Sequence, residues 1–151
     1  MGQDKALLPF KESPTLTQFQ IKRLTPLFQS VHVSIKEPKF DFPTQCIKDV
    51  SNGSSSPMVA LASILTHFTD TYVFIISVDT PFVSEQEIQH LMDASTTADA
   101  IIAKDKSQRH PLCGLYHTRI ASKVQDFVKT NTHKLGRLLE SIDTTYVFFD
   151  D

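Results

Sequence analysis

Three polar residues of the sequence stand where an open α/β sheet would be expected to bind a ligand. Lys5 belongs to the N-terminal segment, Asp49 follows the short run Cys46-Ile47-Lys48, and Asp79 ends a strongly apolar run. Ligands of such sheets bind beyond the carboxyl ends of the strands. An aspartate there can hold Mg²⁺, which prefers oxygen ligands and is usually bound by one or two carboxylates plus substrate phosphates. A lysine there can neutralise phosphate charge.

Each of these residues also has a purely structural interpretation. Asp79 can be explained as an Asx-turn that caps its strand before Pro81, and the local sequence does not separate this from metal binding. Most lysines are solvated, so composition alone favours a surface role for Lys5. Asp49 is equally well explained as an ordinary loop aspartate. The chemistry of these positions therefore depends on the elements that hold them.

The strands of the predicted sheet are indicated by apolar runs and by alternation. Residues 72–78 (YVFIISV) are almost uninterruptedly apolar, as expected of a central parallel strand that is buried on both faces. Val31, Val33 and Ile35 alternate with polar residues, which predicts a second strand. Further extended segments are expected at residues 100–103, 111–116 and 146–149.

Helices are indicated between these strands. Ser13-Pro14 is a helix-start signal, and Pro57 is expected to open a second helix. Ser84 and Glu87 have the spacing of a capping box at the start of a third helix. Apolar residues at helical spacing predict further helices near 120–128 and 135–142. Alternation of strands and helices indicates an α/β fold with a mostly parallel sheet.

Composition limits the classes of function. The chain has 151 residues, a net charge of −2 and 40% hydrophobic residues, which suits one globular domain. No global basic field favours nucleic acid or an anionic membrane as a partner, and no apolar run approaches membrane-spanning length. The N-terminus lacks the pattern of a signal peptide, so the cytoplasm is the expected location.

The two cysteines, Cys46 and Cys113, do not form a CxxC pair, which favours a reducing compartment over a disulfide framework. Together with His110 and His117 they do not have a zinc-site spacing, and we expect no zinc. The polar loop 104–110 is a candidate for contact with an acidic acceptor, although a solvated loop is the preferred interpretation.

Four segments of the sequence share their order and spacing with one known family. They are MGQDKALLPF at residues 1–10, IKDVSNGSSSPMVALASIL at 47–65, SVDTPFVS at 77–84 and HPLCGLYH at 110–117. The first resembles the second half of a signature that reads roughly LAGGxSxRMGxDKALLP in MobA-type molybdenum-cofactor guanylyltransferases. The others resemble that family's aspartate before a GPLAG turn, its metal-site segment and its xPLxGLY strand. The resemblance covers nearly the whole chain.

The resemblance implies one Rossmann-like, three-layer α/β/α nucleotidyltransferase domain over residues 1–151. Compared with the family, these residues lack the first strand and the glycine-rich phosphate loop, and also an N-x-N-T-P segment beyond the last strand. The GPLAG turn reads Ser56-Pro57-Met58-Val59-Ala60 in this sequence, which leaves base specificity less defined.

The resemblance further implies transfer of GMP from GTP to the terminal phosphate of molybdenum-bound molybdopterin, with release of pyrophosphate. Lys5 and Asp79 are the expected catalytic residues, Asp79 holds Mg²⁺, and Lys5, Asp49 and Asp79 contact the nucleotide. GTP and molybdopterin are the expected partners, and molybdenum-insertion and molybdoenzyme-maturation proteins are candidate protein partners.

Two alternatives stay open at this point. A cytidylyltransferase or sugar-phosphate nucleotidyltransferase on the same fold would share the site chemistry and differ in its base and acceptor contacts. A non-catalytic molybdopterin-binding protein is the alternative of a different class, because the glycine-rich loop is not among these residues. Nucleotide binding in the presence of that loop separates the two classes.

Overall fold

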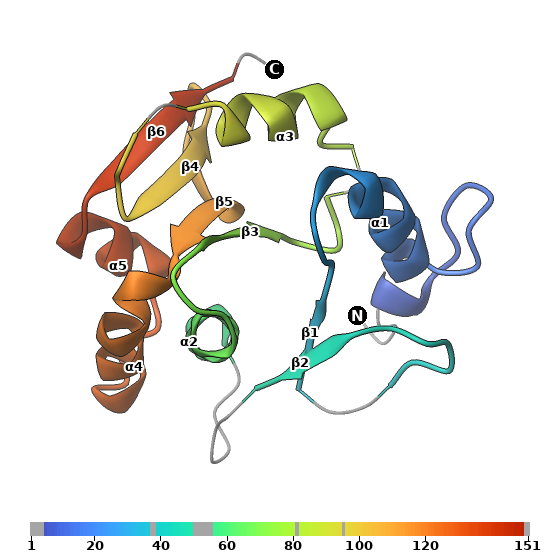
Figure 1. The fold of residues 1–151 in the computed structure, drawn as a ribbon, viewed down its shortest axis with the longest axis horizontal. Coiled ribbons are helices and arrows are strands. Elements are labelled where there is room, and N and C mark those ends of the chain that lie inside the picture. The colour runs from blue at the N-terminus through green and yellow to red at the C-terminus, as the bar shows by residue number, and fades with distance from the viewer. Residues whose placement is uncertain (1–4, 37–38, 50–55, 81, 95, 150–151) are drawn as a thin grey trace.

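The computed structural model describes residues 5–36, 39–49, 56–80, 82–94 and 96–149 (Figure 1). The start of the N-terminal motif, Pro81 and most of the serine-rich stretch 51–56 lie outside the described residues. The strands are β1 (Val33–Ile35), β2 (Cys46–Lys48), β3 (Tyr72–Ile76), β4 (Ala100–Lys104), β5 (Arg109–His117) and β6 (Thr144–Phe148). The α-helices are α1 (Leu16–Leu24), α2 (Pro57–His67), α3 (Glu85–Met92), α4 (Ala121–Lys129) and α5 (Leu135–Ser141), and the 3₁₀-helices are η1 (Lys5–Leu7), η2 (Thr25–Leu27) and η3 (Thr118–Ile120).

The strands of the described residues form two sheets. β1 and β2 make a parallel pair, and the larger sheet has the order β3-β5-β4-β6. In the larger sheet β5 runs antiparallel to both neighbours, and β4 and β6 are parallel. Therefore β3, β4 and β6 all point one way and only β5 is reversed. The predicted mostly parallel α/β arrangement is confirmed, while the reversed β5 was not foreseen.

Helices cover both faces of the larger sheet (Figure 1). Successive side chains of a strand point to opposite faces. Ala100 and Ile102 of β4 accordingly pack with α2, α4 and α5, whereas Ile101 and Ala103 pack with Leu91 of α3. The sheet is thus the middle of three layers, as the sequence predicted. The larger core lies between the sheet and the layer of α2, α4 and α5. Its residues Met58, Leu65, Val124 and Leu138 are almost fully buried.

Two of the three helix-start signals in the sequence are correct. The Ser84 hydroxyl accepts from the Glu87 backbone N–H while the Glu87 carboxylate accepts from the Ser84 N–H, which completes the predicted capping box. Ser56 caps α2 directly before Pro57. The predicted start at Ser13-Pro14 is wrong, because Thr15 is the residue that caps α1. No helix in the described part of the chain has the length and apolar character needed to cross a membrane.

The prediction for residues 72–78 needs a correction. β3 has a strand partner on one side only, β5, and each of its five residues is partly buried. It is therefore an edge strand of the described structure and not a central strand. The most buried strand is β4, where Ala100–Ala103 are all buried. β3 is apolar on both faces because Val73 and Ile75 pack against the core formed with α2, α4 and α5, whereas Tyr72 and Phe74 pack against the core on the α3 side.

Candidate functional site

Asp79 lies in a turn directly after β3. The Thr80 backbone N–H and side-chain hydroxyl both donate to the carbonyl oxygen of Ser77, at 3.3 and 2.8 Å, and so close the turn. The Ser77 hydroxyl donates to the Asp79 carboxylate, with 2.5 Å between Ser77 Oγ and Asp79 Oδ1. Among the described residues this is the one hydrogen-bond partner of that carboxylate, which is exposed. The carboxylate is therefore presented to solvent instead of capping the backbone as an Asx-turn would.

Lys5 is exposed and begins η1, and the segment that follows it is anchored on α1. The Thr17 hydroxyl donates to the carbonyl oxygen of Ala6 at 2.8 Å. The Leu16 backbone N–H donates to the carbonyl oxygen of Leu8 at 2.6 Å. The first turn of α1 therefore sets the position of the N-terminal segment.

The segments that carry Lys5 and Asp79 meet against α1. The Phe10 ring lies 4.7 Å from the Phe19 ring of α1, centroid to centroid. It also makes an edge contact, at 5.6 Å, with the Phe82 ring in the loop after Asp79. Phe82 is 79% exposed, and its ring contact with Phe10 joins the loop after Asp79 to the N-terminal segment. Two of the three predicted site residues thus belong to neighbouring segments.

Asp49 is held separately, at the end of the β1–β2 pair. Its backbone N–H donates to the carbonyl oxygen of Ile35 at 2.9 Å, and the Ser34 hydroxyl lies 3.5 Å from Asp49 Oδ1. Partial burial raises the pKa of the Asp49 carboxyl, against the opposing effects of Ser34 and Lys36. No hydrogen bond or ion pair of the described structure joins Lys5, Asp49 and Asp79 to one another.

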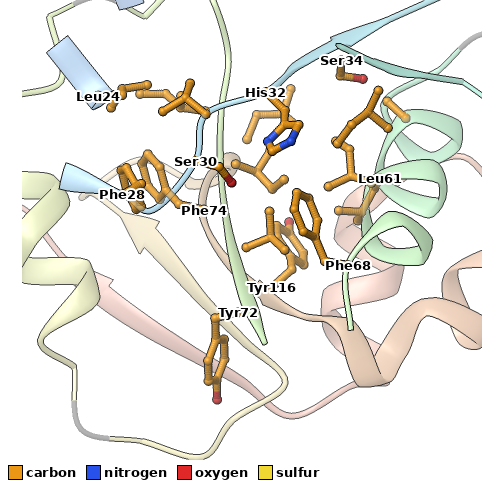
Figure 2. Close-up of a pocket in the computed structure, with 18 of the residues that line it drawn as sticks. Leu24, Phe28, Ser30, His32, Ser34, Leu61, Phe68, Tyr72, Phe74 and Tyr116 are labelled. Atoms are coloured by element: carbon orange, nitrogen blue, oxygen red, sulfur yellow. The ribbon is translucent and has the colours of Figure 1, made fainter. Parts of the chain in front are cut away.

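An apolar slot of about 600 Å³ lies between β1 and β3 (Figure 2). Figure 2 shows Phe28, His32, Leu61, Phe68 and Phe74 around it. β1 and β3 each have a strand on only one side, so two open strand edges border this slot in the described structure. None of the three predicted site residues lines it. The slot is therefore separate from the three predicted site residues and is lined mainly by apolar side chains.

The residues considered for zinc do not assemble. Within the residues that the structure describes, no group of three or more histidine, cysteine or acidic side chains is placed to hold a metal ion. Cys46 is exposed and Cys113 is buried, and burial raises the pKa of the Cys113 thiol to about 11. In the polar loop, His110 Nε2 lies 2.6 Å from Asp105 Oδ2, so part of that loop is occupied by an internal contact.

Residues 1–145 match the family profile described as the MobA-like NTP transferase domain. The chain belongs to this family. A molybdenum cofactor guanylyltransferase of Campylobacter jejuni is 41% identical over 153 residues, which cover 100% of this chain and 80% of the relative. The predicted family is thereby confirmed.

Solved structures agree with this membership in the MobA-like NTP transferase family. A molybdopterin-guanine dinucleotide biosynthesis protein A from Archaeoglobus fulgidus has a TM-score of 0.82 at 20% identity, covering 97% of this chain and 76% of that one. A Mycobacterium tuberculosis protein in complex with manganese has a TM-score of 0.67 at 14% identity, covering 99% and 84%. These likenesses show the fold, a Rossmann-like nucleotidyltransferase domain.

Proposed function

We propose that this protein is a molybdenum cofactor guanylyltransferase. In the proposed reaction an oxygen of the terminal phosphate of molybdenum-bound molybdopterin attacks the α-phosphorus of GTP. A new P–O bond forms, the bond between the α-phosphorus and the bridging oxygen breaks, and pyrophosphate leaves. The observation that carries the proposal is the 41% identity to a protein of that name along the whole chain.

Within this proposal, Lys5 and Asp79 act on the triphosphate. The acceptor phosphate is already ionised at neutral pH, so positioning and charge neutralisation replace a strong general base. The Lys5 ammonium neutralises phosphate charge as pyrophosphate departs. The Asp79 carboxylate would hold the divalent metal, and Asp49 would contact the nucleotide from the β1–β2 pair.

Mg²⁺ is the proposed metal, and Asp79 suits it. One exposed carboxylate, whose Oδ1 accepts from Ser77, matches an ion that keeps several waters and takes its remaining oxygens from substrate phosphates. When bound, Mg²⁺ would supply charge neutralisation on the phosphates. The solved manganese complex of the Mycobacterium tuberculosis protein supports a divalent cation in this fold.

The assay for this proposal contains GTP, Mg²⁺ and molybdenum-bound molybdopterin, and follows formation of the dinucleotide and of pyrophosphate. Competition among GTP, CTP, ATP and UTP tests the base, and we expect GTP to bind most tightly. Tightest binding of CTP would replace the guanylyl assignment by the cytidylyl one. Binding of molybdopterin without release of pyrophosphate would favour the non-catalytic alternative.

We also propose that residues 1–151 act as one domain together with a strand and a glycine-rich loop contributed from outside them. The slot between β1 and β3 supports this, because an additional apolar strand would pair with both open edges and fill about 600 Å³. The glycine-rich loop would then follow that strand and supply backbone N–H groups to the triphosphate.

The cytoplasm remains the proposed location, since Cys46 and Cys113 are both free thiols. Proteins that insert molybdenum or mature molybdoenzymes remain the proposed protein partners. Affinity purification of the tagged protein from its own cells would identify them.

A further inference from the structure

Gln20 of α1 is a buried polar residue whose side chain faces the Asp79 turn. It is only 5% exposed, whereas glutamine is usually solvated. Its amide nitrogen Nε2 donates to the carbonyl oxygen of Val78 at 3.2 Å and lies 3.5 Å from that of Ser77. Burial of an amide is unfavourable unless it is hydrogen-bonded, so these carbonyl contacts account for its place in the interior.

Arg23, one turn later on α1, extends this contact to the far side of the turn. Its Nε donates to Gln20 Oε1 at 2.6 Å, and its Nη1 donates to the carbonyl oxygen of Val83. The guanidinium therefore fixes the orientation of the Gln20 amide and holds the chain beyond Asp79. Burial lowers the pKa of Arg23, because removal from water disfavours the charged guanidinium, and the hydrogen bonds to Gln20 and Val83 offset part of that cost.

These contacts hold the turn at both of its ends and leave Asp79 between them. Val78 is bound by Gln20 before the aspartate and Val83 is bound by Arg23 after it. The first turn of the same helix binds Ala6 and Leu8, next to Lys5. One helix thus contacts the segments of both proposed catalytic residues.

The geometry points to α1 as the helix that fixes the relative positions of Lys5 and Asp79. Gln20 and Arg23 are the positioning residues for Asp79. This inference rests on the proposed function, in which Asp79 would hold the divalent metal. Partners that orient a metal-binding group affect metal binding strongly, because loss of such a partner typically weakens metal affinity by about 10–100-fold.

The variant Gln20→Leu keeps the side-chain volume and removes both the amide donor and the oxygen that Arg23 binds. In the protein that carries the glycine-rich segment, saturated with GTP, Mn²⁺ affinity is measured from the electron paramagnetic resonance signal of free Mn²⁺. We expect Mn²⁺ to bind about tenfold more weakly, at the lower end of the usual range for a supporting residue. The Mg²⁺ concentration for half-maximal turnover should rise by a similar factor.

Arg23→Lys keeps the charge but cannot bind Gln20 and Val83 with one planar fork. It should weaken Mn²⁺ binding less than Gln20→Leu. If Gln20→Leu does not fold, Arg23→Lys alone tests whether the contacts of α1 with the Asp79 turn support metal binding. Gln89→Leu is the matched control, because Gln89 is exposed on α3 and binds only Asp93 in the described structure. We expect its Mn²⁺ affinity to be unchanged.

The outcomes separate the two proposals. Lower thermal stability of the Gln20 and Arg23 variants with unchanged Mn²⁺ affinity would make these residues structural only and overturn the inference. Unchanged Mn²⁺ affinity in Asp79→Asn would instead contradict the proposed function. Weaker binding in Asp79→Asn and in Gln20→Leu, with Gln89→Leu unaffected, supports both.

Discussion

β4 and β1 are held in different ways. β4 lies between β5 and β6, its residues Ala100–Ala103 are buried, and helices cover both of its faces. β1 is three residues long, pairs only with β2 among the described strands, and borders the apolar slot. The proposed catalytic residues Lys5 and Asp79 belong to segments that pack on α1, and Asp49 lies at the end of the β1–β2 pair. We therefore expect substitutions around β4 to change mainly the stability of the fold, and substitutions in the segments of the proposed catalytic residues to change mainly turnover.

The largest effect is expected for Asp79→Ala. Turnover should fall by roughly 100- to 1,000-fold, the usual loss when one electrostatic contact to a transferring group is removed. The thermal midpoint should change little, because the carboxylate is exposed and bound only by Ser77 among the described residues. Turnover and thermal unfolding are measured on the same preparation.

Asp126→Ala is the control, because Asp126 is an exposed residue of α4, which lies well apart from α1 and the end of β3 (Figure 1). It should leave turnover unchanged. If Asp79 served only as a strand cap, its removal would lower stability by about 1 kcal/mol and spare activity. That result would exclude Asp79 from the reaction.

The next largest effect concerns nucleotide affinity. The 151 residues alone should bind GTP weakly, because a lone exposed Lys5 is partly screened by solvent and the glycine-rich donors lie outside them. Addition of a strand with a LAGG-type loop before residue 1 should restore binding. Two charge-assisted hydrogen bonds at about 1.5 kcal/mol each correspond to on the order of a 100-fold gain.

Calorimetric titration of GTP into both proteins measures this gain. Hydrogen exchange on the same samples sharpens the comparison, since filling of the slot should slow exchange in β1 and β3 and leave β4 unchanged. Equally tight GTP binding by both proteins would contradict the proposed role of the glycine-rich loop. Unaltered exchange in β1 would contradict placement of the added strand in the slot.

A stability effect without a catalytic effect is expected at Gly114 in β5. A Cβ at this position would lie 2.4 Å from the Ile101 carbonyl oxygen and 2.7 Å from Ile102 Cδ1. Gly114→Ala should therefore lower the free energy of unfolding by about 1–3 kcal/mol, the usual effect of overpacking. Denaturant unfolding measures it. Turnover per folded molecule should stay within twofold of the parent, or about 0.4 kcal/mol, and a larger loss would show that the two regions are coupled.

The features that the sequence predicted well are local ones. The capping box of Ser84 and Glu87 and the start of α2 at Pro57 depend on residues within one turn, so their patterns are sufficient. The edge position of β3 and the reversal of β5 depend on which distant strands pair. The apolar sequence of residues 72–78 does not reveal whether the neighbour of this strand is another strand, a helix or a cavity.

The candidate site residues could be predicted from the sequence, but the contacts of α1 that hold them could not. Lys5 and Asp79 were found through motifs, and the structure places their segments side by side against α1. The role of Gln20 was missed, although a signal existed. Gln20 lies four residues from both Leu16 and Leu24, on the buried face of the helix. A polar side chain on such a face must bind something in the interior.

The smallest effect is expected in the β4–β5 turn. The Asp105 carboxylate accepts from His110 and from the backbone N–H groups of Gln108 and Ser107. The His110 hydrogen bond is the largest cause, and together these contacts lower the pKa of Asp105 from 3.8 to about 2. Because the folded-state pKa is depressed, the stabilisation is fully present above 3.8 and is lost as the pH falls towards 2.

Asp105→Asn should therefore remove a pH dependence and leave catalysis intact. Between pH 3.8 and about 2, the parent protein should lose stability more steeply than the variant. Urea unfolding at several pH values across this window measures the difference, which should be small because Asp105 lies in a surface turn where solvent screens its charge. Turnover at neutral pH should not change, since this turn belongs to the region around β4. Loss of turnover in Asp105→Asn would instead indicate that the loop contacts the acidic acceptor. The β4–β5 turn would then belong with the segments that take part in the reaction.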